Sequence, residues 1–364
     1  MKKNLKIGII TINDNNNYGN RLQNYAVQET IRKMGKYDVI TLKNSPRFNN
    51  RCGIINFFKK IIAHLYSNIR KWIKDNKNRR KCFKDFNKKI RFSKRIKTIY
   101  SKLDNEYDFF VAGSDQIWKP TYGRMSQMDL LAFATPYKRL SFSASFGVES
   151  LSASEKILAK KELEKFNAIS VREEAGKKIV DDLDIGKKVE VLIDPTMMLD
   201  SCEWEKVMKK PAKLESKRYV LTYFLGNMSE EKENEIKRFA KKHDCDIINL
   251  LNKDDIFYET GPSEFLYLEK NAFLICTDSF HSCVFSILFD RPFVVFEREG
   301  NIVNMNSRID TLLSKFELES KRYNGSISDE YLSCDYIHVK EILKKEKEKT
   351  ECFLRRALNI KDGI

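Results

Sequence analysis

Short apolar runs rich in β-branched residues recur along the chain, and stretches with helical spacing separate them. In the first third, residues 5–12 (LKIGIITI) and residues 37–42 (YDVITL) flank a helix-like stretch at residues 21–34. Such continuous apolar runs are typical of strands that are buried on both faces of a parallel sheet. A strand, a helix and a second strand form a right-handed βαβ unit. The alternation therefore predicts an α/β fold built on parallel sheets.

The alternation continues over most of the 364 residues. Further strands are predicted at residues 107–115, 139–147, 168–173, 189–194, 218–226, 246–250, 273–278 and 292–297. Further helices are predicted at residues 154–166, 174–183, 229–243, 279–289, 307–316 and 338–359. A chain of this length suggests two domains of ordinary size. We expect two Rossmann-like doubly wound domains that face each other across a cleft, divided into an N-terminal domain (1–200) with a basic helical insertion (51–100), a C-terminal domain (201–337) and a C-terminal helix (338–364).

One segment holds nearly all of the formal net charge of +16. Residues 51–97 contain 17 Lys and Arg residues against two acidic residues, and the remainder of the chain is close to neutral. We therefore predict no nucleic-acid partner. Apolar residues in 54–97 keep helical spacing, which favours a basic amphipathic helix lying on an anionic inner membrane surface. The alternative is that the apolar side packs on the N-terminal domain and the lysines are solvated.

Other features of the composition place the protein in the cytoplasm. No apolar run reaches the 18 residues that a membrane-spanning helix needs. The first residues, MKKNLKIGIITI, suit a first strand better than a signal peptide. The eight cysteines are scattered without a C-x-x-C pair, which is typical of reduced thiols. We see no metal-binding constellation and predict neither a metal nor a cofactor.

Ligands of doubly wound sheets bind beyond the carboxyl ends of the strands. The loop after the first strand carries side chains that suit sugar hydroxyls. These predicted acceptor-binding residues are Asn17, Tyr18, Asn20 and Gln23. The alternative is a capped turn before a helix. The single glycine there does not make a dinucleotide fingerprint.

The strand at residues 107–115 ends in a second polar group, GSDQIWKP. Asp115 is a candidate base or sugar ligand, Gln116 a candidate sugar ligand, and Trp118 could stack on a sugar face. In the alternative, Asp115 caps a helix and Trp118 packs in the core. The next candidate is Arg172, in SVREE, because a guanidinium fork matches phosphate and carboxylate. Its alternative role is an ion pair with a neighbouring acid.

The stretch CTDSFHSC, residues 276–283, connects a predicted strand to a predicted helix. Asp278 or Ser279 is a plausible N-cap, which places His281 in the first helical turn, near free backbone N–H groups. With Ser282, this stretch forms a predicted anion site that contains a titratable group. The alternative is that His281 packs against the sheet. The other three histidines are interpreted as structural.

Seven blocks of sequence, in order, resemble the polysaccharide pyruvyl transferase family. They span roughly residues 5–316 and are NYGNRLQNYAVQ, FVAGSDQIW, SFSASFG, SVREEAG, LIDPTMML, the long block from GPSEFLYLEKN to DRPFVVF, and SRIDTLL. The resemblance implies a GT-B-like fold, phosphoenolpyruvate as donor, and a saccharide acceptor, often lipid-linked. The product is a pyruvate ketal on two hydroxyls, as in exopolysaccharide or capsule synthesis. His281 aligns with a family histidine, and Arg172 lies in a block that carries a donor-binding arginine.

The sequence departs from the family at the histidine. Ser279 stands where ketal-forming members have an arginine, and Ser282 stands where they have a glycine. Arg291, Arg298 and Arg308 are candidates to replace that charge. In the expected mechanism His281 does acid–base work, Arg172 clamps an anionic group, and Asp115 and Glu173 are reserve bases. Two other functions stay open: a GT-B glycosyltransferase that uses a nucleotide-sugar, and a non-catalytic membrane-associated scaffold of polysaccharide assembly.

Overall fold

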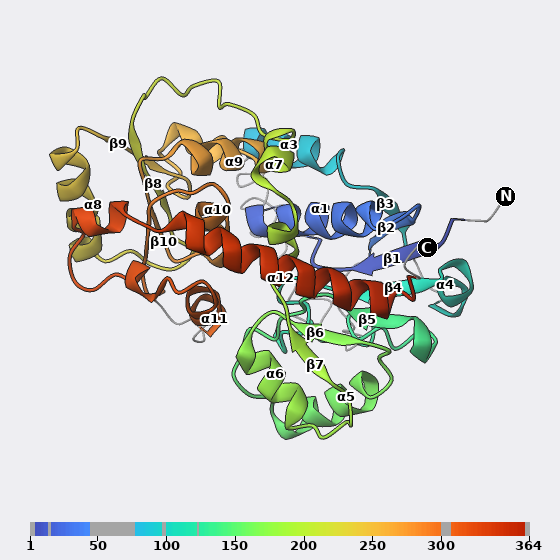
Figure 1. The fold of residues 1–364 in the computed structure, drawn as a ribbon. Coiled ribbons are helices and arrows are strands. Elements are labelled where there is room, and N and C mark those ends of the chain that lie inside the picture. Colours follow the sequence, from blue (N-terminus) through green and yellow to red (C-terminus); the bar gives the residue numbers. More distant parts are fainter. Residues whose placement is uncertain are drawn as a thin grey trace, which may run out of the picture.

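The computed structural model describes residues 4–13, 16–43, 77–96, 100–121, 124–299 and 307–360. Two parallel sheets form its frame (Figure 1). The first sheet has the order β3-β2-β1-β4-β5. Isolated bridges from Leu140 to Ala168 and from Ala144 to Val171 attach the pair β6-β7 to its edge. These strands are β1 (Lys6–Ile10), β2 (Asp38–Lys43), β3 (Phe92–Arg95), β4 (Phe109–Ala112), β5 (Arg139–Ser141), β6 (Ile169–Val171) and β7 (Val189–Val191).

The second sheet has the order β11-β10-β8-β9 and all its pairs are parallel. Its strands are β8 (Tyr219–Tyr223), β9 (Asp246–Asn249), β10 (Leu274–Thr277) and β11 (Phe293–Val295). Two parallel sheets with helices between their strands confirm the predicted α/β, GT-B-like fold. The helices are α1 (Tyr18–Lys33), α3 (Lys77–Asn87), α4 (Tyr100–Glu106), α5 (Ala153–Leu163), α6 (Glu174–Asp181), α7 (Ser201–Glu205), α8 (Glu230–Lys242), α9 (Pro262–Asn271), α10 (Phe280–Leu288), α11 (Ser307–Lys315) and α12 (Tyr336–Ala357), with short 3-10 turns η1 (Pro136–Lys138), η2 (Pro195–Met198), η3 (Ile256–Glu259), η4 (Glu319–Lys321) and η5 (Asp329–Leu332).

Strand β3 is an element that the sequence did not reveal. It pairs with β2 at the edge of the first sheet. Its four residues, FSKR, contain two cations and no apolar run, so periodicity gave no signal. An edge strand needs no second apolar face, and charged side chains are common there.

An apolar core runs without interruption through the boundary between the two sheets. It joins α1 and α3 to α9 and α10. The Tyr18 ring of α1 stacks on Phe265 of α9, with ring centroids 4.6 Å apart, and on Phe83 of α3, at 5.4 Å. A boundary packed in this way opposes hinge motion. It fixes the spacing of side chains that meet across it.

The described part of the basic segment, residues 77–96, contains helix α3 and strand β3. Its apolar residues Phe83 and Phe86, and Ile90 just after it, are buried in the same core. In this part the apolar side packs within the protein, as in the alternative interpretation. Residues 51–76 lie outside the described residues, so the predicted membrane contact stays a prediction.

The last helix, α12, returns from the second sheet to the first (Figure 1). Lys349 Nζ donates to the Val191 carbonyl at 2.9 Å, and Asn167 Nδ2 donates to the Ala357 carbonyl at 3.2 Å. Phe353 packs in the core of the first sheet. The helix therefore ties the end of the chain to the N-terminal half. Over the described ranges, no helix is long and apolar enough to cross a membrane.

Candidate active site

Helices α1 and α10, from opposite halves of the molecule, begin at the same place. Helix α1 starts at Tyr18 and α10 starts at Phe280. A Cβ atom built on Gly19, in the first turn of α1, would lie 2.1 Å from Nδ1 of His281, in the first turn of α10. Only a glycine allows this approach. Because free N–H groups favour anions at a helix N-terminus, both first turns favour an anionic ligand at this boundary.

A pocket of about 400 Å³ opens where the two helices begin. Its volume lies within the range of about 300–1,000 Å³ that small-molecule sites have. Both halves of the molecule contribute to its wall. The lining residues are Ile12, Asn17, Asn20, Asp115, Gln116, Lys119, Thr121, Arg124, Leu225, Ser279, Phe280, His281, Arg298 and Arg308.

Basic side chains outnumber acidic ones in the wall of the pocket. Arg298 and Arg308 come from the C-terminal half, and Lys119 and Arg124 come from the N-terminal half. Asp115 is the acidic residue among the lining residues. A concave site with this charge balance concentrates anions.

Asp278, which the sequence predicted to bind an anion, instead positions an arginine. Its carboxylate accepts hydrogen bonds from the backbone N–H groups of Leu225 (2.6 Å) and Gly226 (2.8 Å). It also accepts one from Nε of Arg298 (3.1 Å), and Arg298 Nη2 donates to the Asp278 carbonyl at 2.8 Å. The prediction for Asp278 was wrong because its oxygens are occupied by these donors. Its effect is to hold Arg298 beside Ser279 at the start of α10.

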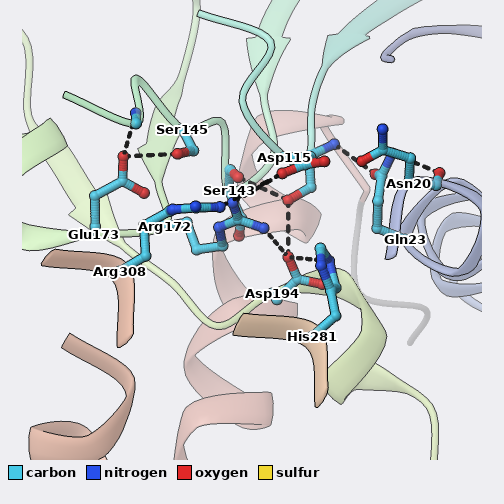
Figure 2. Close-up of polar contacts among 12 residues, drawn as sticks. Asn20, Gln23, Asp115, Ser143, Ser145, Arg172, Glu173, Asp194, His281 and Arg308 are labelled. Carbon is cyan, nitrogen blue, oxygen red and sulfur yellow. Dashed lines mark hydrogen bonds and ion pairs between the residues drawn. The ribbon is translucent and has the colours of Figure 1, made fainter. Parts of the chain in front are cut away.

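Arg172 lies behind the wall of the pocket and is 3% exposed. Its Nη1 donates to Asp194 at 2.7 Å and its Nη2 donates to Asp115 at 3.1 Å (Figure 2). Its guanidinium also lies 4.4 Å from the centroid of the Phe280 ring. The prediction of a donor clamp is therefore corrected to the alternative, a buried arginine that pairs with acids.

Asp115 is held between arginines at the edge of the pocket. Its backbone has a φ of 64°, which turns the chain sharply after β4. Burial raises the pKa of its carboxyl, but Arg172, His281 and Arg308 together outweigh burial and hold that pKa below its usual value. Asp115 is therefore ionised at neutral pH and is a poor match for a general base.

Arg308 is a buried cation that faces the pocket. Burial and the nearby Arg172 lower its pKa to about 10, although Asp115, 3.9 Å away, opposes the shift. Its guanidinium remains charged at neutral pH. A buried cation beside the pocket is stabilised further when an anion binds.

His281 lies at the centre of the site and is 7% exposed. Its Nε2 is 3.8 Å from Oδ2 of Asp194 (Figure 2). Burial lowers the pKa of the imidazole below its usual value of 6.5, although Asp194 and Asp115 act in the opposite direction. His281 is therefore neutral at pH 7 when the pocket holds no anion.

Comparison with known proteins decides the family. The profile described as "Polysaccharide pyruvyl transferase" matches residues 17–300, which is most of the chain. The chain belongs to the polysaccharide pyruvyl transferase family. The matched region contains the first turns of both α1 and α10, and it ends before Arg308. No curated protein matches the chain.

Solved structures resemble the chain only distantly. UDP-N-acetylglucosamine 2-epimerase from Rickettsia bellii is 13% identical, with a TM-score of 0.45, over 99% of this chain and 100% of that chain. The Methanocaldococcus jannaschii UDP-GlcNAc 2-epimerase in complex with UDP-GlcNAc and UDP is 13% identical, with a TM-score of 0.45, over 94% and 99%. The E. coli ADP-heptose lps heptosyltransferase II is 11% identical, with a TM-score of 0.37, over 95% and 99%.

Three of the six predicted acceptor residues line the pocket, namely Asn17, Asn20 and Gln116. Trp118 does not, because it is fully buried and its Nε1 donates to the Asp129 carbonyl at 3.1 Å. That prediction was wrong, and Trp118 is a core residue.

Tyr18 and Gln23 also lie away from the pocket, so their predicted contact with the acceptor is corrected. The Tyr18 hydroxyl is 2.9 Å from Oγ1 of Thr260 within the interdomain core. Gln23 Nε2 donates to Oγ1 of Thr11 at 2.7 Å, and its Oε1 accepts from the backbone N–H of Ser114 at 3.0 Å. Both residues shape the wall from behind.

Two predicted donor-site residues face elsewhere. Ser282 is fully buried, and its Oγ donates to Glu269 of α9 at 2.6 Å. Arg291 follows the C-terminal end of α10, opposite the first turn, and its Nε donates to the Phe289 carbonyl at 3.1 Å. The prediction for Ser282 was wrong because neighbouring sequence positions on a helix point in different directions. The prediction for Arg291 was wrong because it lies at the other end of α10. Of the candidate replacement cations, Arg298 and Arg308 are the two that line the pocket.

Sequence reasoning did not select Asp194, Lys119 or Arg124. Asp194 is the third residue of the block LIDPTMML, and its position at the end of a predicted strand was an available signal. Lys119 follows the buried Trp118, and nothing in its local pattern distinguished it from a surface lysine. In the described part of the chain, no group of three His, Cys, Asp or Glu side chains could hold a metal ion; the absence of a metal and a cofactor stays a prediction.

Proposed function

We propose that the protein transfers a pyruvyl group from phosphoenolpyruvate to two hydroxyls of a saccharide and forms a cyclic ketal. The observation that carries the proposal is the pocket at the two helix starts, where Arg298, Arg308 and His281 line one wall. Phosphoenolpyruvate has two anionic groups, a phosphate and a carboxylate. Two arginines and two first helical turns supply donors for both.

The opposite wall suits the acceptor. Asn17, Asn20 and Gln116 present amide groups, which can donate to and accept from sugar hydroxyls. The donor is therefore assigned to the C-terminal half and the acceptor to the N-terminal half. His281, between them, can exchange protons with either.

The reaction balances without a cofactor. One acceptor hydroxyl adds to the central carbon of the enol, and the methylene carbon takes up a proton. Phosphate then leaves, and the second hydroxyl attacks the same carbon and releases its proton. His281 is the group that we assign to moving these protons. Bound donor anions favour the protonated imidazole, so donor binding raises the pKa that burial lowers.

The setting is part of the proposal. The acceptor is a saccharide of a cell-surface polysaccharide, such as an exopolysaccharide or capsule, and it is carried by a lipid. The reaction takes place in the cytoplasm at the inner membrane face, where the basic segment 54–97 would contact anionic lipid.

A donor panel tests the reaction. Purified full-length protein is incubated with a saccharide mixture and either labelled phosphoenolpyruvate or labelled nucleotide-sugars. We expect label in saccharide from phosphoenolpyruvate alone, with release of phosphate. His281→Ala should lower this turnover by roughly 10²–10⁴-fold, whereas His338→Ala, at an exposed histidine bonded to Glu317, is the matched control.

A glycosyltransferase is the second candidate, because Ser279, the N-cap of α10, stands where the resemblance to the family leads us to expect an arginine. Transfer from a nucleotide-sugar, with none from phosphoenolpyruvate, would establish it and overturn the proposal. Transfer from neither donor would favour the non-catalytic scaffold.

A further inference from the structure

Asp194 connects His281 to the buried polar network beneath the pocket. Its Oδ1 accepts from the backbone N–H (3.0 Å) and the hydroxyl (2.7 Å) of Thr196. Its Oδ2 accepts from Arg172 (2.7 Å) and from the hydroxyl of Ser114 (3.2 Å). The Ser114 hydroxyl shares its one proton with the Ser143 carbonyl (2.9 Å), so the two Thr196 donors and Arg172 fix the carboxylate most firmly. Figure 2 shows its Oδ2 directed at His281. Asp194 is 1% exposed, so water does not compete for these bonds.

The imidazole of His281 faces Asp194 through Nε2. Its Nε2 is buried, has no hydrogen-bond partner, and is 3.8 Å from Oδ2 of Asp194. Gly19 of α1 packs against the ring at Nδ1. A buried polar nitrogen without a partner is rare and calls for an explanation. Hydrogen bonds at active sites are often long in the empty protein and shorten when ligand is bound.

The two residues belong to different halves of the molecule. Asp194 precedes η2 in the N-terminal half, and His281 begins α10 in the C-terminal half. Helix α1 and α10 pack in one apolar core, which fixes the spacing across the boundary. The pair therefore assembles only when the two halves are docked as they are here.

We propose that Asp194 is the positioning residue of His281: its Oδ2 holds the Nε2 proton of the imidazole across the domain boundary and leaves Nδ1, the other ring nitrogen, to exchange protons. This orients the imidazole as a base is oriented by a third group in other active sites. The neutral tautomer carries its proton on Nε2 and its lone pair on Nδ1. When a hydroxyl proton moves to Nδ1, its O–H bond breaks, an N–H bond forms, and the carboxylate stabilises the resulting imidazolium.

Other charged groups around the imidazole act with and against Asp194. Asp115 favours the protonated ring, and Arg172 and Arg308 oppose it. Arg21 of α1 is turned away and donates to the Ile12 carbonyl at 2.6 Å. Glu269 of α9 is engaged by Ser282, the next residue of α10. Asp194 is therefore distinguished by its position at Nε2 and not by charge alone.

The direction of proton exchange depends on the proposed function, but the pairing does not. The pairing is measured on full-length protein labelled with ¹⁵N-histidine, without substrate, from long-range ¹H–¹⁵N spectra recorded over pH 5–9. The chain has four histidines, so a His281→Gln spectrum assigns the signal. We expect wild-type His281 to carry its neutral proton on Nε2.

In Asp194→Asn we expect the tautomer preference to weaken and the midpoint of the His281 titration to fall by roughly one pH unit. Ser114→Ala, which removes one bond to the same oxygen and no charge, should leave the tautomer unchanged. A wild-type signal with the proton on Nδ1 would overturn the proposal even if Asp194→Asn does not fold. An unchanged tautomer in folded Asp194→Asn would do the same. Loss of pyruvyl transfer with the tautomer intact would count against the proposed function alone.

In the pyruvyl transfer assay, Asp194→Asn should lower kcat by a large factor and change KM by a smaller one. If Asp194 only supported the fold, its substitution would lower the amount of active protein but would not shift the pH profile of kcat. A shift of the acidic limb of that profile to lower pH, parallel to the NMR midpoint, is the expected result.

Discussion

Gly19 and His281 define the site at the scale of single residues. The sequence showed Gly19 only as an isolated glycine that made no dinucleotide fingerprint. The structure explains it: a side chain at this position would occupy the space of the imidazole from the other half of the molecule. A contact between residues 262 positions apart leaves no trace in local sequence patterns, so it could not be predicted.

Gly19→Ala tests that contact. The added methyl group would overlap His281 Nδ1, so we expect the free energy of unfolding to fall by about 1–3 kcal/mol and turnover to fall about 100-fold, because small displacements at reacting groups cost that much. Urea unfolding and the donor assay measure the two effects. The control is Gly176→Ala on α6, where the nearest atoms would be 3.4 Å away.

The double variant Gly19→Ala, His281→Ala removes the overlap and should recover most of the lost stability. Additive losses in the double variant would show that the two residues do not interact. That result would contradict the packing described at the start of α1 and α10.

The sequence predicted the positions of some residues of the candidate site correctly and those of others only in part. His281 was predicted because it lies just after a strand, in the first turn of a predicted helix. That signal is contained in the neighbouring sequence. Arg172 was placed at the right strand end, but its partners come from distant segments. Asp278 and Ser282 flank His281 in sequence and face other neighbours, which only the packing of α10 determines.

At the scale of elements, α3 joins the two halves of the molecule. Arg79 is 5% exposed, and its Nη1 donates to the Tyr18 hydroxyl (2.5 Å) and to the Tyr258 carbonyl (2.7 Å). Its guanidinium also lies 4.6 Å from the Tyr18 ring and 5.2 Å from the Phe83 ring. Tyr18 is the first residue of α1, so α3 supports the wall of the pocket from behind.

Arg79→Ala should lower the free energy of unfolding by about 3 kcal/mol, because it removes charged hydrogen bonds and leaves buried acceptors without donors. Lys81→Ala, at an exposed position of the same helix, should change it by less than about 0.5 kcal/mol. Urea denaturation of both variants measures the difference. Equal effects of the two substitutions would mean that α3 only covers the surface.

Periodicity predicted most of the helices and strands because their apolar faces are continuous. It failed at β3, whose four residues include two cations and whose strand character comes from pairing with β2. It also gave a second basic helical stretch without showing that α3 packs on the C-terminal half. Pairing and docking partners are properties of the folded chain, which a single segment does not encode.

At the scale of the whole molecule, two parallel sheets hold two helix starts against each other. The first turns of α1 and α10, Arg298 and Arg308 create one region that favours anions, and amide side chains face it from the other half. The division into two Rossmann-like halves, each with its own parallel sheet, could be predicted from the order of strands and helices. The placement of the last helix against the first sheet could not, because it depends on how the halves dock.

The central claim is that the methylene carbon of phosphoenolpyruvate is protonated and that the neighbouring central carbon is bonded to two saccharide oxygens. The most direct measurement is the NMR spectrum of the saccharide product formed from phosphoenolpyruvate in D₂O. We predict a ketal whose methyl group carries one solvent deuterium, with no vinyl protons. A product that keeps its vinyl protons, or no pyruvyl product while a nucleotide-sugar is consumed, would contradict the account.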